Sequence, residues 1–118
     1  MRTALAAAIL GVALCTTWPA FAHTDLVKSS PAAASTGPAP KTIVLRFSEK
    51  VAPAFIGFAL TMDSGMKMSL TTAVSRDGKV VTCTPKGPLV PGGYKLAWHA
   101  AAADDGHRTD GTFSFKIN

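Results

Sequence analysis

The sequence is poor in cysteine, histidine and charged residues, and these shortages exclude several classes of protein. Two of the 118 residues are Cys, three are His, and Asp, Glu, Lys and Arg together make up only 16%. Cys15 lies in an N-terminal segment that we expect to be removed, so no internal disulfide would stabilise the remaining chain. Cys83 lies in a β-branched run and is predicted to be a buried apolar residue. The 47% of apolar residues excludes an intrinsically disordered tail.

The chain is also short, and its positive charge is scattered. A length of 118 residues allows one domain and excludes a TIM barrel or a long repeat array. The formal net charge is +5, but no run of Lys or Arg marks a surface that would follow a phosphate backbone. We therefore expect no nucleic-acid partner. Ten Gly and eight Pro indicate a fold with many turns.

The first 22 residues have the parts of a secretory signal peptide. A positively charged start precedes an apolar stretch at residues 5–14, and residues 20–22 read Ala-Phe-Ala, which fits the signal-peptidase motif. The apolar stretch is shorter than the ~20 residues that span a bilayer, which argues against an uncleaved anchor. We expect cleavage after Ala22, export to the periplasm, and a mature domain of residues 23–118 that begins at His23.

The remaining chain has the pattern of short β-strands. Apolar and polar residues alternate with a period of two over four segments: residues 43–47, 58–62, 94–100 and 113–117. Asp77-Gly78 between two strand-like runs predicts a type I′ hairpin turn, and residues 29–40, rich in Ala, Ser, Pro and Gly, predict a loop. No segment shows a helical period. The pattern predicts an all-β fold, a small antiparallel Greek-key β-sandwich or barrel of about seven strands.

Two of the three histidines occur where they could bind a metal ion. His23 would be the first residue after cleavage, so its free α-amine and its ring could close one chelate ring on a metal. Asp105 and His107 lie two residues apart, and the glycine between them lets the backbone bend so that both side chains converge. Three nitrogens and one carboxylate oxygen suit Cu(II) better than zinc. The alternative is an accidental terminal His and a polar turn, but their co-occurrence favours the metal site.

Four segments spread over residues 23–118 form a specific combination. They are His23 with the Leu-Val-Lys-Ser-Ser-Pro-Ala run that follows, residues 43–49, residues 91–99, and the Asp-Gly-His of 105–107 with residues 111–115. Together these segments resemble the CopC family of periplasmic copper-binding proteins. The Trp-His dipeptide at residues 98–99 and the Asp-Gly-His tripeptide at residues 105–107 are most similar to its YobA branch. The resemblance covers essentially the whole predicted mature domain.

The resemblance implies a fold, a metal and a role. The fold is a small cupredoxin-like, immunoglobulin-like β-domain. The metal is one Cu(II) per mature chain, held by the amine and imidazole of His23, by His107 and by Asp105. The role is that of a copper carrier or buffer in copper homeostasis or resistance, without enzymatic turnover, acting as a monomer beside an inner-membrane transporter of the CopD type.

Several alternatives stay open at this point. Some family members carry a methionine-rich loop that binds Cu(I), and the matching stretch here holds Met62, Met66 and Met68 but no His. We interpret these methionines as structural, with a remnant Cu(I) site as the alternative. His99 is either a surface residue or a partner near the metal. Two other functions compete with the carrier: a histidine-brace copper oxidase of the polysaccharide monooxygenase kind, and a metal-free immunoglobulin-like interaction domain.

Overall fold

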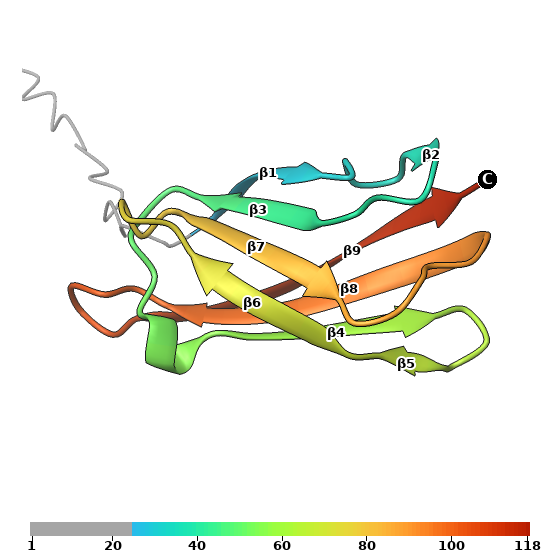
Figure 1. Cartoon of the computed structure of the whole chain (residues 1–118). Coiled ribbons are helices and arrows are strands. Elements are labelled where there is room, and N and C mark those ends of the chain that lie inside the picture. The colour runs from blue at the N-terminus through green and yellow to red at the C-terminus, as the bar shows by residue number, and fades with distance from the viewer. Residues whose placement is uncertain (1–24) are drawn as a thin grey trace, which may run out of the picture.

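The computed structural model describes residues 25–118, which fold into two facing β-sheets (Figure 1). One sheet has four strands in the order β1 (Leu26–Ser30), β3 (Ile43–Phe47), β7 (Val80–Pro85) and β6 (Leu70–Val74). The other has five strands in the order β2 (Thr36–Gly37), β9 (Arg108–Ile117), β8 (Gly92–Ala101), β4 (Gly57–Met62) and β5 (Lys67–Met68). The one helical turn in this part of the chain, η1 (Pro53–Phe55), is far too short to cross a membrane. The predicted all-β sandwich is confirmed.

The core lies between the two sheets and is built from the alternating residues of the predicted strands. The inward residues are buried: Ile43, Leu45 and Phe47 of β3, Tyr94, Leu96 and Trp98 of β8, and Phe113, Phe115 and Ile117 of β9. The Trp98 ring meets the Phe47 ring edge-on at a centroid distance of 5.2 Å, an arrangement that aromatic pairs favour. Cys83 of β7 is fully buried, as predicted, and its burial raises the pKa of the thiol to about 12.

The hairpin between β6 and β7 is confirmed, but its predicted turn type is wrong. A type I′ turn needs positive φ at both central residues, whereas Gly78 has φ +74° and Asp77 is not among the residues with positive φ. The Gly78 N–H instead donates to the Ser75 carbonyl at 3.0 Å. The Asp77 carboxylate accepts hydrogen bonds from the Ser75 hydroxyl and the Lys79 N–H, and these bonds lower its pKa. Side-chain bonds within a longer loop therefore replace the tight turn.

The predicted loop over residues 29–40 is also partly wrong. Strand β1 continues through Ser30, and β2 forms within the loop and pairs in parallel with Lys116 and Ile117 of β9. Two short strands, β2 and β5, raise the number among the described residues above the expected seven. A strand of two residues is too short to show an alternation of apolar and polar residues. It is defined only by its backbone pairing with a neighbouring strand.

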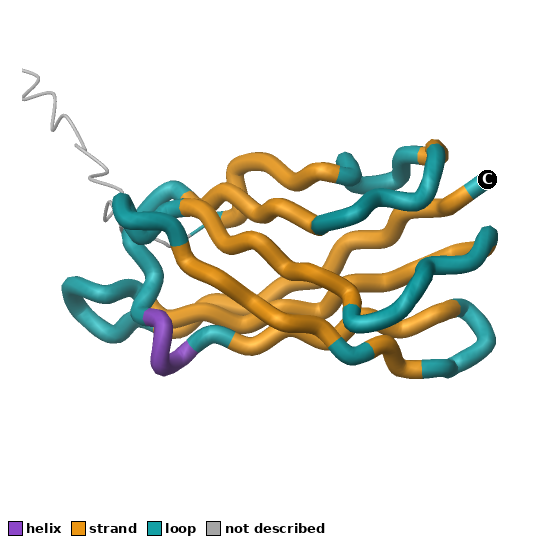
Figure 2. The backbone as a smooth tube through the Cα atoms, viewed as in Figure 1, coloured by secondary structure: helices purple, strands orange, loops and turns teal. Residues whose placement is uncertain are grey.

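Strand direction places the predicted functional residues at one end of the sandwich. Strands β4 and β8 pair in antiparallel fashion, with Gly57 opposite His99 near one end and Met62 opposite Tyr94 near the other. The loop between β8 and β9 and the turn η1 therefore share one end, while the β4–β5 hairpin lies at the other (Figures 1 and 2).

Candidate metal centre

The loop between β8 and β9 is a tight turn closed by its own backbone. The Ala102 N–H donates to the His107 carbonyl at 2.9 Å, and the Gly106 N–H donates to the Ala102 carbonyl at 3.0 Å. Gly106 has φ +72°, a conformation that glycine adopts without strain. The glycine between Asp105 and His107 thus bends the backbone, as the sequence predicts.

Asp105 and His107 lie side by side in this turn, and both are exposed. The Asp105 Oδ1 atom accepts a hydrogen bond of 2.9 Å from the backbone N–H of His107. A carboxylate has about four acceptor positions, so this bond fixes the orientation of the group and leaves lone pairs for another ligand. The bond joins the Asp105 side chain to the backbone of His107, and a metal site at these two residues stays a prediction.

The third predicted residue, His23, lies outside the described residues, but Asp25, two residues later, is held by hydrogen bonds to Ser48. Asp25 and Ser48 form a reciprocal pair, in which the Asp25 N–H donates to Ser48 Oγ and the Ser48 N–H donates to the Asp25 carbonyl, each at 2.9 Å. Asp25 and His107 line the same hollow, with a volume of about 670 Å³, together with Leu26 and Trp98. The N-terminal arm and the loop that carries His107 therefore meet at one surface.

Residues 25–118 do not by themselves supply a complete metal site. No group of three or more His, Cys, Asp or Glu side chains in this range is placed to hold a metal ion. The predicted site, which joins Asp105 and His107 to His23, includes a residue that lies outside this range. Cys83 is remote from such a surface site, because its side chain is fully buried in the core between the two sheets.

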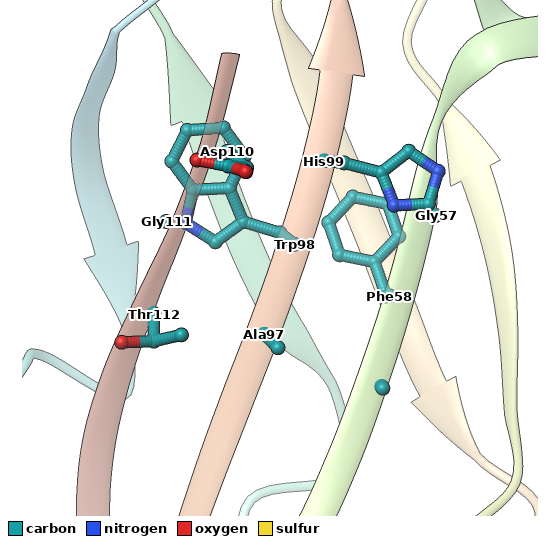
Figure 3. A pocket seen from close by; sticks show the side chains of 9 residues that line it. Gly57, Phe58, Ala97, Trp98, His99, Asp110, Gly111 and Thr112 are labelled. Atoms are coloured by element: carbon teal, nitrogen blue, oxygen red, sulfur yellow. The ribbon is translucent and has the colours of Figure 1, made fainter.

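His99 lies on the outer face of the five-stranded sheet, away from the core. Its ring extends over Gly57 of β4, and a Cβ atom at Gly57 would overlap the His99 ring. Figure 3 shows His99 and Asp110 on either side of β8, at a shallow hollow that includes Ala97 and Thr112. This position supports the interpretation of His99 as a surface residue.

The three methionines do not share one environment. Met62 and Met68 pack against the hydrophobic core, whereas Met66, at the tip of the β4–β5 hairpin, is 60% exposed. The Met62 N–H donates to the Met66 carbonyl and the Gly65 N–H donates to the Met62 carbonyl, each at 2.8 Å. This arrangement supports a structural role for Met62 and Met68, at the end of the sandwich opposite His107.

Residues 48–52 form a link that the sequence pattern does not predict. Val51 pairs with Ala102 in an isolated β-bridge. The Ala52 N–H donates to the Ala101 carbonyl at 2.9 Å, and the Ala103 N–H donates to the Lys50 carbonyl at 2.8 Å. These bonds join the base of the loop to the chain that follows β3. They are made by backbone groups, so no residue type or spacing in the sequence signals them.

Comparisons with known proteins agree with this architecture. A family model described as CopC domain matches residues 26–118. Copper resistance protein C of Xanthomonas campestris pv. juglandis is 41% identical over 105 residues, covering 83% of this chain and 82% of that protein. Protein YobA of Escherichia coli (strain K12) is 34% identical over 100 residues, covering 82% of this chain and 80% of that protein. The crystal structure of PcoC, a methionine-rich copper resistance protein from Escherichia coli, superposes with a TM-score of 0.75 at 34% identity and covers 82% of this chain and 100% of that one.

Proposed function

The chain belongs to the CopC family, and we propose from this premise that it carries or buffers copper in the periplasm. In this proposal one Cu(II) ion binds per mature chain as cargo, and the protein performs no turnover. His23 provides its α-amine and imidazole, His107 its imidazole and Asp105 a carboxylate oxygen. Two relatives of this chain are copper resistance proteins C, which supports a role in copper homeostasis and resistance.

The observation that carries the proposal is the hollow shared by Asp25 and His107. Two residues of extended chain span at most about 7 Å. Covalent geometry therefore keeps His23 within that distance of Asp25, which its bonds to Ser48 hold at the wall of the hollow. Donors from the two ends of the sequence can then meet beside His107.

The chemistry of the donors supports Cu(II). Amine, imidazole and carboxylate groups suit Cu(II), whereas thiolate and thioether ligands select Cu(I). The one cysteine of the described residues is buried, and the exposed Met66 lies between β4 and β5, whose hairpin is at the far end of the sandwich (Figure 1). A site for the softer ion therefore has no sulfur donor from the described residues near His107.

Export and exchange complete the proposal. Removal of residues 1–22 would deliver the chain to the periplasm and free the His23 amine, which an uncleaved leader would convert to an amide. We further propose that the monomer exchanges copper with an inner-membrane transporter of the CopD type.

A competition titration of purified mature protein against a Cu(II) chelator tests the proposal, with His107→Ala as the critical variant. Loss of an outer-shell partner typically costs about 10–100-fold in metal affinity, and loss of a direct ligand should cost more. Asp105→Asn should weaken binding less than His107→Ala, because an amide oxygen remains near. His99→Ala, which removes an exposed imidazole elsewhere, is the matched control and should bind like wild type. Equal affinity of His107→Ala and His99→Ala would contradict the proposed site.

A further inference from the structure

Residues 48–52 contact both parts of the proposed copper site. At one end of this segment, Ser48 exchanges two hydrogen bonds with Asp25, two residues after His23. At the other end, Lys50 and Ala52 bond to Ala103 and Ala101, which form the base of the loop that carries Asp105 and His107. The same five residues thus connect the N-terminal arm with the β8–β9 loop.

The segment is itself firmly held. Val51 is 2% exposed, and its N–H donates to the Gly78 carbonyl at 2.9 Å. Gly78 lies against Lys50, close enough that an added Cβ would approach the Lys50 Cβ at 3.2 Å. Residues 48–52 are therefore fixed between the β6–β7 hairpin and the β8–β9 loop.

We infer that residues 48–52 are a positioning segment that pre-organises the copper site, with Ser48 as the positioning residue for His23. This inference rests on the proposed function. A site whose donors come from distant parts of the sequence loses affinity when one part moves freely, because binding must then order it. Ser48 Oγ is the side-chain atom that ties the arm to the segment. Its removal leaves the backbone bond from the Ser48 N–H to Asp25 in place.

Ser48→Ala tests the inference in the mature protein. We expect its Cu(II) affinity to fall about tenfold, at the lower end of the effect of outer-shell partners, while Ser48→Thr keeps a hydroxyl and restores binding. Ser29→Ala is the matched control, because Ser29 also bonds a backbone group through its hydroxyl, to the Pro31 carbonyl at 2.9 Å, and its partner in the sheet is Leu45, outside residues 48–52. It should bind Cu(II) like wild type.

A double-mutant cycle shows whether Ser48 acts through the N-terminal donors. One extra Ala placed before residue 23, combined with His23→Ala, removes both the α-amine and the imidazole of that residue, and Ser48→Ala should then weaken binding by much less than tenfold, because coupled residues are not additive. The same affinity loss with and without this double change would overturn the inference, and so would wild-type affinity in Ser48→Ala. Both results presuppose tight Cu(II) binding by wild type; weak binding by wild type would instead refute the proposed function.

Discussion

Replacement of Gly111 by Ala should displace the Trp98 side chain and so perturb one wall of the candidate metal centre. Gly111 of β9 lies opposite Trp98 of β8 in the sheet register. A Cβ atom added at Gly111 would lie 2.7 Å from Trp98 Cζ2 and 2.9 Å from Trp98 Cε2. These distances are below van der Waals contact, so the indole must move. The Trp98 ring also meets the Phe47 ring edge-on and is only 7% exposed, so it has little room to move.

Displacement of the Trp98 ring should lower the free energy of unfolding of Gly111→Ala. Overpacking of a well-packed core typically costs about 1–3 kcal/mol, and each kcal/mol lowers the melting temperature of a domain of this size by roughly 4–8 °C. The indole and His107 line the same hollow, so the displaced ring should also reduce Cu(II) affinity. The glycine is thus required by the close approach of Trp98 and not by its backbone conformation.

Thermal unfolding of the metal-free protein and its tryptophan emission measure the effect. Trp98 is the only tryptophan outside the predicted leader, so the emission reports on this ring. Gly37→Ala is the matched control, because no atom lies within 4 Å of an added Cβ at Gly37. Gly111→Ala should melt at a lower temperature and shift the emission, whereas Gly37→Ala should do neither. Identical melting and emission for the two variants would refute the packing argument.

Three further predictions concern pH and sulfur. Cu(II) affinity should fall steeply from pH 8 to pH 5, because protons compete with copper for the amine and imidazole donors; a flat profile in the chelator titration would exclude nitrogen ligands. Burial raises the pKa of Cys83 from 9.0 to about 12. As the pH rises, the thiol therefore ionises at a lower pH in the unfolded state than in the folded state. In urea titrations, the free energy of unfolding should therefore fall as the pH rises above about 9. Cys83→Ala should not show this fall. Met66→Leu/Met68→Leu should leave Cu(I) binding, measured against a Cu(I) chelator, as weak as in wild type; tight wild-type binding that the double variant loses would restore the Cu(I) site.

Much of the fold could be predicted because burial leaves a period-two signature in the sequence. Strands β3, β8 and β9 alternate apolar and polar residues, since one face of each packs on the core. Strand β2 has no such signature, because its pairing depends on backbone groups of β9 that are distant in sequence. The turn at Asp77-Gly78 was predicted as a hairpin from the residue types, but its conformation depends on the Ser75 and Asp77 side-chain bonds.

The candidate site could be predicted only in part, for a similar reason. Asp105 and His107 are close in sequence, and the intervening Gly106 predicts a bend between them, which the positive φ of Gly106 and the bond from the His107 N–H to the Asp105 carboxylate show. Ser48 bonds to Asp25, and Lys50 and Ala52 bond to the base of the loop that carries His107, largely through backbone groups. Such bonds are independent of residue type, so the link between the two parts of the site appears only in the folded chain.

The central claim is that donors from both ends of the mature chain bind one Cu(II) ion. A Cu(II) competition titration of two purified proteins tests this most directly: the mature chain beginning at His23, and the same chain with one extra Ala before His23. The extra residue converts the His23 amine to an amide and leaves residues 25–118 unchanged. We expect tight binding of one Cu(II) by the first protein and a large loss of affinity in the second. Equal affinity of the two proteins would contradict it.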